Sequence, residues 1–560
     1  MYCKIDYFVP LFACLFNYLS ANSLSAEKAT EDVICNTNYG KLKGFVAENL
    51  VDGLITKANV FLGIPFAKPP IAELRFEKPI APNKWKDIQN ASAFSPACFP
   101  HHSKEFRNGQ ASSHSEDCLY LNVIAPHSKS PEPNGYPVLV FIHGGAFAIG
   151  SAVEFGWESF ADLFVSQDLV VVTIQYRLGP LGFAASGDES FPGNLGLWDA
   201  RMAMKYVNEN IHHFGGDPKR VTAWGHSAGS AIVDGLSLST HSQDLFAQSI
   251  QMSGAVFGEW TTSNRVIQES DKLAAALNCD KHLADSKLLK KCLRGKSVHE
   301  ILDGVDKIIP GRRDVNMIKF GPRLDADFFT NDYPQLIESA KKKTTLMGAT
   351  ESEAITFTLF GALTDNIMNY LGVSLEKMAI FSKPDFDNFL VEVIATETVF
   401  GAKAKQVQDR ISAFYLRNPD KRAEDNQFYL EKYTEMISDI TFFVPTLMEA
   451  RYKTAAGWPV FLYFIDYFNS NKYPEQIPVK GSYHAVEYPY LLPENPYFPT
   501  FEFDQEDKNF QKHFWILSSH SPRLGEAILC FSKKNLFTYL RQPSVGSTKW
   551  PALSDTAPLT

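Results

Sequence analysis

The sequence predicts an α/β fold in which a large, mostly parallel central sheet is flanked by helices. Two apolar runs, 137–143 and 169–176, are near-continuous, as is typical of strands buried on both faces. The stretch 197–214 has the length and apolar spacing of a helix, a glycine pair ends it, and a short strand follows at 221–224. Strands that alternate with helices in this way form parallel sheets.

The remaining elements extend the same sheet. Small residues at 228–233 begin a helix directly after that short strand, and the apolar runs 245–252 and 460–465 are expected to be further buried strands. Longer polar and aromatic stretches between 265 and 450 are expected to be helical insertions over the sheet. No internal repeat and no low-complexity linker divides the chain, so we expect a single domain over residues 27–560.

The composition is that of an average globular protein. Apolar residues make up 45% of the 560 residues and charged residues 21%, so a large buried core is expected. The formal net charge of −9 gives no general attraction to nucleic acid or to an anionic membrane surface. Nucleic-acid binding is therefore excluded as a first hypothesis, and the activity has to be sought in local motifs.

Residues 1–26 have the layout of a secretory signal peptide. One lysine and a polar start precede a mostly apolar stretch at 8–19, and small residues follow, so cleavage is expected after Ala26 or Ala21. The apolar stretch is shorter than the ~20 residues that span a bilayer, and a signal anchor is the alternative. No other stretch approaches that length, so we expect a secreted protein without stable membrane insertion.

Cysteine usage agrees with export. Cys3 and Cys14 lie in the predicted signal peptide, and an even number of cysteines remains, which favours disulfides in an exported chain. No CxxC motif supports a zinc or redox site, and no metal or other cofactor is expected. Asn90 begins the single glycosylation sequon and predicts a modified surface position. The candidate pairs closest in sequence are Cys98–Cys118 and Cys279–Cys292, with Cys35 and Cys530 left to pair with each other or to stay free.

The chemistry is predicted at a turn between a strand and a helix. Residues 225–229 fit the motif G-x-S-x-G, in which a sharp, strained turn raises the Ser227 hydroxyl above the sheet. Glycines flank the serine because side chains there would strike the neighbouring strand and helix. The motif alone is weak evidence, but the strand before it and the helix after it are the context that a serine nucleophile requires.

A second turn supplies candidate donors for a developing oxyanion. The strand at 137–143 leads directly into Gly144 and Gly145, which allow backbone N–H groups to point at a substrate oxygen. The N–H of Ala228, directly after the nucleophile, is the further candidate. Together with Ser227 these groups predict acyl transfer.

These motifs resemble those of type-B carboxylesterases, the cholinesterase-like branch of the α/β-hydrolases. The similarity fades after about residue 490, although 549–551 resembles one more family motif. The resemblance implies the α/β-hydrolase fold, both local disulfides and a Ser-Glu-His triad that hydrolyses carboxylic esters to acid and alcohol, with a small-molecule ester as the substrate. The segments that carry it are 61–67, 115–122, 143–146, 176–179, 193–197, 214–218 and 225–229.

The resemblance also assigns the partners of Ser227. The family's acid lies five residues after a glycine, which selects Glu353 after Gly348, with Glu351 as the alternative. The segment 481–487 resembles the one that carries the base, His484, although Ala485 replaces its usual following glycine. In that scheme His484 takes the Ser227 proton and Glu353 fixes the imidazole tautomer. Ser253 matches a family serine thought to support the triad, and a plain strand-end serine is the alternative.

Two departures from the choline-hydrolysing relatives bear on the substrate. Their loop closed by the first disulfide holds a tryptophan that stacks on the quaternary ammonium, whereas Cys98–Cys118 here encloses Phe99 and Phe106 and no tryptophan. Before the nucleophile those relatives have a glutamate, and this chain has His226. We therefore expect neutral esters rather than choline esters.

Three hypotheses follow. The first is a secreted serine carboxylesterase that forms an acyl-enzyme on Ser227. The second, from another class, is a catalytically inactive cholinesterase-like adhesion or binding protein, although such relatives typically lose a triad residue and carry a membrane span. The third keeps the enzyme and changes its substrate to that of a lipase or of a hormone- or odorant-ester hydrolase. The sequence does not predict the oligomeric state.

Overall fold

The computed structural model describes most of the chain. The described residues are 31–51, 54–101, 113–308, 315–316, 318–363, 371–417, 426–495, 501–511, 528–531 and 538–540. The predicted signal peptide, Phe106 and the motif at 549–551 lie outside them.

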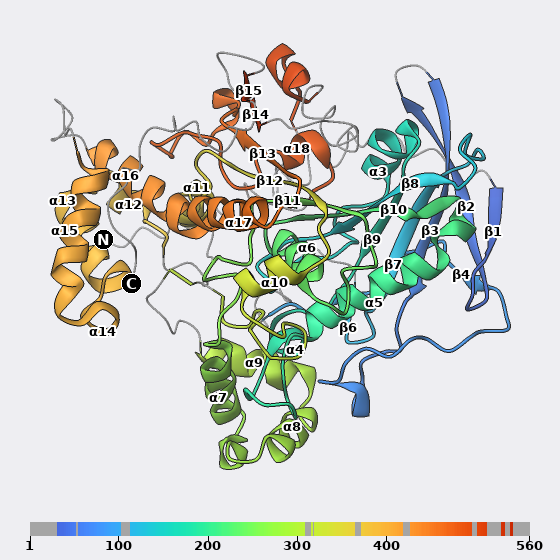
Figure 1. The fold of residues 1–560 in the computed structure, drawn as a ribbon, viewed down its shortest axis with the longest axis horizontal. Helices are drawn as coiled ribbons and strands as arrows, with labels where there is room; N and C mark the ends of the chain where they lie inside the picture. Colours follow the sequence, from blue (N-terminus) through green and yellow to red (C-terminus); the bar gives the residue numbers. More distant parts are fainter. Residues whose placement is uncertain are drawn as a thin grey trace, which may run out of the picture.

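A single large sheet runs through the molecule, with helices around it (Figure 1). Its central strands are all parallel to their neighbours, in the order β9-β8-β10-β11-β12-β13-β14. This confirms the predicted mostly parallel sheet flanked by helices, which is the α/β-hydrolase architecture that the resemblance implied. The parallel strands are β8 (Tyr136–Ile142), β9 (Val170–Ile174), β10 (Gly216–His226), β11 (Gln248–Met252), β12 (Thr344–Thr350), β13 (Val460–Ile465) and β14 (Ile528–Phe531).

Antiparallel strands complete the sheet at its ends. On one side β1, β2, β3 and β7 pair antiparallel in sequence and join the parallel part through β9, and on the other β15 pairs with β14. The sequence analysis did not predict this region. The side chains of β1 are mostly exposed and form no continuous apolar run, whereas β7 is largely buried and was missed nonetheless. These strands are β1 (Glu31–Asn36), β2 (Lys41–Val51), β3 (Leu54–Pro65), β7 (Tyr120–Pro126) and β15 (Thr538–Leu540); the short strands are β4 (Gln89–Asn90), β5 (Ala97–Cys98) and β6 (His114–Ser115).

The helices surround the sheet and are given below in chain order. Figure 1 shows α12 to α16 gathered at one end of the molecule, opposite the strands β1 to β4. The helices before β12 are α3 (Glu158–Leu163), α4 (Gly179–Phe183), α5 (Leu195–Asn210), α6 (Ala228–Leu238), α7 (Val266–Ala276), α8 (Ser286–Arg294), α9 (Val298–Ile308) and α10 (Tyr333–Ser339). The helices after β12 are α11 (Ile355–Thr358), α12 (Leu375–Met378), α13 (Lys383–Phe389), α14 (Glu397–Phe400), α15 (Ala404–Tyr415), α16 (Asn426–Ser438), α17 (Val444–Ala455) and α18 (Tyr488–Leu491).

The predicted insertions between 265 and 450 are indeed helical, with one correction. The strand β12 lies among them and pairs with β11 and β13 in the middle of the parallel sheet. The sequence did not predict it because its run, TTLMGAT, begins with two threonines and holds a glycine. The predicted short strand at 221–224 also extends over the whole of β10.

Side chains alternate between two buried cores on the two faces of the sheet. In β8, Val138, Val140 and Ile142 belong to the core that also contains residues of α5 and α6. Leu139 and Phe141 of the same strand belong to the core that contains residues of α3 and α18. This double burial explains why β8 and β9 are apolar at nearly every position.

Both predicted local disulfides are formed. The Cα atoms of Cys98 and Cys118 lie 5.0 Å apart, and those of Cys279 and Cys292 lie 5.9 Å apart. Cys35 is a buried free thiol, so it does not pair with Cys530, whose side chain lies outside the described part. No helix within the described ranges is long and apolar enough to cross a membrane.

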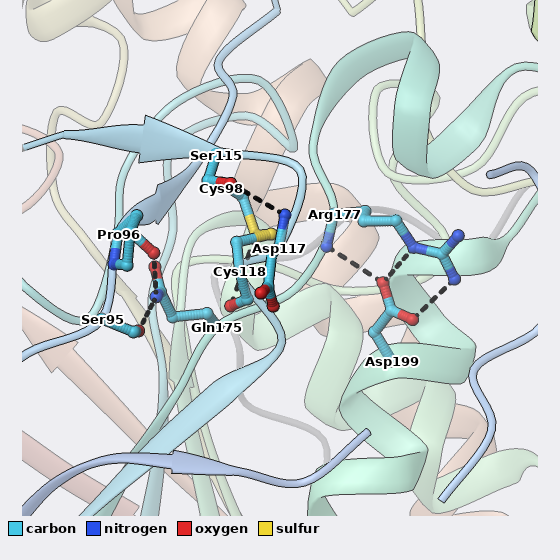
Figure 2. Close-up of a disulfide and its surroundings, with 9 residues drawn as sticks. All are labelled: Ser95, Pro96, Cys98, Ser115, Asp117, Cys118, Gln175, Arg177 and Asp199. Carbon is cyan, nitrogen blue, oxygen red and sulfur yellow. Dashed lines mark hydrogen bonds and ion pairs between the residues drawn. A yellow bond between two sulfur atoms is a disulfide. The ribbon is translucent and has the colours of Figure 1, made fainter. Parts of the chain in front are cut away.

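Figure 2 shows the first disulfide beside a buried ion pair. The guanidinium of Arg177 donates to both carboxylate oxygens of Asp199, at 2.7 Å each, and its backbone N–H donates to one of them at 3.1 Å. Two parallel bonds of this kind fix the geometry of both side chains. The pair therefore fastens the segment after β9 to helix α5, close to the disulfide loop.

Candidate active site

The candidate nucleophile lies on a strained turn. Ser227 connects the last residue of β10 to the first residue of α6 with φ 56° and ψ −124°, a backbone conformation that non-glycine residues rarely adopt. Its N–H donates to the carbonyl of Met252 at 2.7 Å, which fastens the turn to the end of β11. A Cβ atom on Gly229 would lie 2.0 Å from the carbonyl oxygen of Ile142, so only glycine fits there. This is the geometry that the G-x-S-x-G motif predicts.

The structure brings Glu353 and His484 together. His484 Nδ1 lies 2.5 Å from Glu353 Oε2, and the backbone N–H of His484 donates to the Glu353 carbonyl at 3.3 Å. Glu353 follows β12 and His484 follows β13, and these neighbouring parallel strands end at the same edge of the sheet. The alternative acid, Glu351, is exposed, and its backbone N–H donates to Ile465 on β13.

Glu353 is held by more than His484. It is fully buried and accepts hydrogen bonds from the Ser253 hydroxyl at 2.6 Å and from the Thr350 N–H at 2.8 Å. Burial by itself raises the pKa of this carboxyl, but His484 and these two donors outweigh it and leave the pKa below its usual value. Glu353 is therefore ionised where a histidine partner needs an anion.

Ser227 and His484 are brought near each other but not into a hydrogen bond. Ser227 is 9% exposed, and no hydrogen bond joins its hydroxyl to His484 within the described residues. His226, the residue before Ser227, contacts His484 instead, and their ring centroids lie 4.7 Å apart. Catalytic hydrogen bonds are often open without substrate and close when it binds.

The glycine turn after β8 passes directly against the nucleophile. A Cβ atom on Gly144 would lie 3.1 Å from the Cβ of Ser227, and Gly145 has φ +105°. Within the described chain no hydrogen bond engages the N–H groups of Gly144, Gly145 or Ala228. The N–H of Ala146 is equally unengaged, and this residue, which the sequence analysis did not select, has φ +57°. Unengaged N–H groups beside a serine suit a developing oxyanion.

Aromatic side chains surround the imidazole of His484. The ring centroids of Phe442 and Phe357 lie 4.8 Å and 5.1 Å from that of His484, and the two phenylalanines stack on each other. Trp260 continues the group, with its ring 5.4 Å from Phe442. No sequence motif marks these residues, because Trp260 lies between β11 and β12, whereas Phe357 and Phe442 lie far apart in the segment between β12 and β13. The surroundings of the base are therefore apolar.

The loop of the first disulfide contributes packing in its described part. Phe99 is buried and lies against His114 and against His299 of α9. Among the described residues, no group of three or more histidine, cysteine, aspartate or glutamate side chains is placed to hold a metal ion.

A buried histidine–carboxylate pair next to a serine on a strand-to-helix turn, at the edge of a mostly parallel sheet, defines an α/β-hydrolase. Residues 31–520 match the model of the carboxylesterase family, and the chain belongs to that family of carboxylic ester hydrolases. It is 36% identical over 529 residues to gut esterase 1 of Caenorhabditis briggsae, covering 93% of this chain and 87% of that protein. It is 32% identical to mouse acylcarnitine hydrolase (85% of this chain, 80% of that protein) and 30% identical to mouse cholinesterase (83% and 74%).

Proposed function

We propose that this chain is a secreted serine carboxylesterase that hydrolyses small carboxylic esters through an acyl-enzyme on Ser227. The observation that carries the proposal is the buried hydrogen bond between His484 and Glu353 beside the strained turn of Ser227. Hydrolysis requires a serine, a base to activate it and an anion to hold that base. This chain offers all three at one edge of its sheet.

In the proposed reaction His484 takes the hydroxyl proton as Ser227 attacks the ester carbonyl. The N–H groups of Gly144, Gly145 and Ala228 are proposed to stabilise the resulting oxyanion. Protonated His484 then gives its proton to the leaving alcohol, and water attacks the acyl-enzyme by the same steps in reverse. Glu353 fixes the tautomer of His484 and stabilises its cationic form.

The substrate is proposed to be a neutral ester. The apolar rings of Phe357, Phe442 and Trp260 beside His484 favour such a substrate. The missing tryptophan in the loop of the first disulfide agrees with this proposal, because a choline ester would use it for a cation–π contact. The residues of the triad are all present in the chain, whereas an inactive adhesion protein is expected to lack one of them.

Export is part of the proposal. The signal peptide at 1–26, cleaved after Ala21 or Ala26, would deliver the domain 27–560 to an oxidising compartment where disulfides persist. The two formed disulfides and the exposed position of Asn90, the proposed glycosylation site, are consistent with such a compartment.

The decisive experiment compares hydrolysis of a short aryl ester and of acetylthiocholine by the wild type, Ser227→Ala and Ser237→Ala. Ser237 is a matched control, because it lies buried in the same helix and its hydroxyl donates only to the Val233 carbonyl of that helix. We expect aryl-ester turnover to be lost in Ser227→Ala and retained in Ser237→Ala. Turnover that survives in Ser227→Ala would disprove the mechanism, and a preference for acetylthiocholine would disprove the substrate assignment.

A further inference from the structure

A second histidine and a second carboxyl group lie behind the triad. His226 ends β10 directly before Ser227, and Glu487 follows His484 at the start of α18. His226 Nε2 lies 3.5 Å from Glu487 Oε1, and the two side chains are 2% and 0% exposed. None of the three atoms, His226 Nε2 and both Glu487 carboxyl oxygens, has a hydrogen-bond partner on another described residue. Buried polar atoms of this kind require an explanation.

The two groups are uncharged near neutral pH. Burial, and then the charge of Glu353, raise the pKa of Glu487 to about 8. Burial and the neighbouring His484 hold the pKa of His226 well below its usual value, although Glu353 opposes them. His484 also faces Glu487 and opposes the rise of its pKa, and the other titratable groups that face it are tyrosines 463 and 483. No lysine or arginine in the described chain forms an ion pair with this carboxyl, so a proton is the only available source of compensation.

The position of His226 relates this pair to the triad. Glu353 holds His484 only at Nδ1, which leaves the imidazole free to tilt about that bond. Phe442 and Phe357 lie beside the ring, and His226 packs against it as well, at 4.7 Å between centroids. The ring of His226 is in turn packed against Tyr488 at 4.5 Å. The orientation of the His484 imidazole therefore depends on the position of each ring packed against it.

We propose that Glu487, as a carboxylic acid, donates a hydrogen bond to His226 Nε2 and that the held His226 ring positions His484 as the general base. This inference rests on the proposed function. A movement of about 0.5 Å closes the 3.5 Å separation to an ordinary hydrogen bond. Both are positioning residues, since neither touches the reacting atoms.

The neutrality of this pair also matters during the reaction. When His484 takes the serine proton, a positive charge arises next to the His226 ring. A protonated His226 would repel that charge, whereas a neutral ring does not. Among the described residues, Glu353 is then the ionised group that contacts the imidazolium. The glutamate that choline-hydrolysing relatives have before the nucleophile is His226 here, so its negative charge is absent.

Two substitutions of similar volume test the proposal. Glu487→Gln retains an N–H donor toward His226, and Glu487→Leu retains the volume without a donor. With an aryl ester at pH 7, we expect kcat of Glu487→Gln within about threefold of the wild type, and kcat of Glu487→Leu reduced about 10- to 100-fold. The KM of both variants is expected to stay within about twofold of the wild type. Labelling of Ser227 by a fluorophosphonate should slow in parallel with kcat.

Glu494→Gln is the matched control. Glu494 is another buried carboxyl whose pKa is raised, to about 7, by burial and by Glu158, but it accepts from the Ser159 N–H, away from the triad. Its substitution is expected to leave kcat unchanged. Equal kcat values for Glu487→Gln and Glu487→Leu, whether high or low, would overturn the proposal, because only Glu487→Gln retains a donor toward His226.

A variant of the other partner covers the case in which Glu487→Leu does not fold. His226→Phe keeps a ring against His484 and removes the acceptor, and we expect its kcat to fall about tenfold or more. Wild-type kcat in His226→Phe would overturn the pair. Ser227→Ala, measured in parallel, separates the two proposals. If Ser227→Ala retains activity, the proposed function is wrong. If Ser227→Ala is inactive and Glu487→Gln and Glu487→Leu have equal kcat values, only the proposed hydrogen bond between Glu487 and His226 is wrong.

Discussion

Two clusters of fully buried ionisable side chains meet helix α6, and they differ in kind. The triad cluster consists of Glu353, His484, His226 and Glu487 and lies where α6 begins. The lysine cluster consists of Asp234 of α6 with Glu449 and Lys453 of α17, and all three side chains are 0% exposed. In the lysine cluster, Lys453 Nζ contacts Glu449 and lies 2.8 Å from Asp234.

The difference lies in how charge is compensated. Burial lowers the pKa of Lys453, but Asp234 and Glu449 outweigh it and raise the pKa above its usual value, so the ammonium is permanent. Among the described residues, the triad cluster has two histidines but no lysine or arginine beside its two carboxyl groups, and Glu487 is neutral near pH 7 because its raised pKa lets it hold a proton. Buried acids therefore do not by themselves mark an active site. A raised carboxyl pKa does not mark one either, since Glu494 beside Ser159 has one. The hydrogen bond of a carboxylate to a histidine next to a strained serine turn is the more specific sign.

Removing Glu353, the proposed acid of the triad, should have the largest effect. Glu353→Gln keeps the shape but no longer fixes the His484 tautomer, so we expect kcat to fall about 10³- to 10⁴-fold with an aryl ester. The exposed neighbour supplies the control, and Glu351→Gln should retain wild-type kcat. The reverse result would assign the acid to Glu351.

Removing the cation of the lysine cluster should instead affect stability. Lys453→Met leaves two carboxyl groups without a cation, and we expect the free energy of unfolding in urea to fall by about 3–5 kcal/mol. The kcat of the folded enzyme should stay within about twofold of the wild type. In the control Lys432→Met the lost ion pair with Glu435 is partly exposed, and a loss below about 1 kcal/mol is expected. If Lys453→Met and Lys432→Met lose the same free energy of unfolding, the burial of the lysine cluster adds nothing to the cost of losing its cation.

The two clusters also differ in how far the sequence predicted them. The strands β8 and β9 were predictable because both of their faces are buried and their sequences are continuously apolar. The sequence of β13 is continuously apolar as well, although most of its side chains are only half-buried. Ser227 was predictable from a local motif, since its turn needs glycines next to it. The pairing of Glu353 with His484, 131 residues apart, came only from the family resemblance.

The remaining contacts depend on topology alone. Lys453 and Asp234 lie 219 residues apart, and no local pattern announces their contact. His226 could be read from the motif, but Glu487 reaches it only because β10 and the loop after β13 end at the same edge of the sheet. The antiparallel strands β1 to β3 escaped prediction for a different reason, since partly exposed strands leave only a weak apolar pattern.

The protonation of Glu487 predicts a pH dependence of stability. The folded-state pKa is raised to about 8 from a usual 4.5, so the folded state binds more protons than the unfolded state between these values. Stability contributed by this group is therefore present below about pH 4.5 and is lost as the pH rises to 8. The loss amounts to about 3 kcal/mol between pH 5 and pH 8. Urea unfolding of Glu487→Gln should show a flatter pH dependence over this range, whereas parallel curves would mean that Glu487 is ionised when folded.

The smallest effect is expected at the turn that carries His484. Ala485 has φ +68°, where the resemblance expects glycine, so Ala485→Gly should relieve about 1 kcal/mol of backbone strain. The methyl group is 4% exposed and packs in the core, so its removal costs about 0.8 kcal/mol, and the net change in the free energy of unfolding should be near zero.

Ala326 isolates the two contributions, because it has φ +61° and an exposed methyl group. Ala326→Gly should relieve the same kind of strain without loss of packing, so its free energy of unfolding should exceed that of Ala485→Gly by about 0.8 kcal/mol, each relative to the wild type. If Ala485→Gly stabilises the protein as much as Ala326→Gly does, the buried methyl group contributes nothing to stability, and the turn of the proposed base His484 holds alanine at the expense of strain. A kcat unchanged in both variants would show that this turn holds His484 in place with either residue.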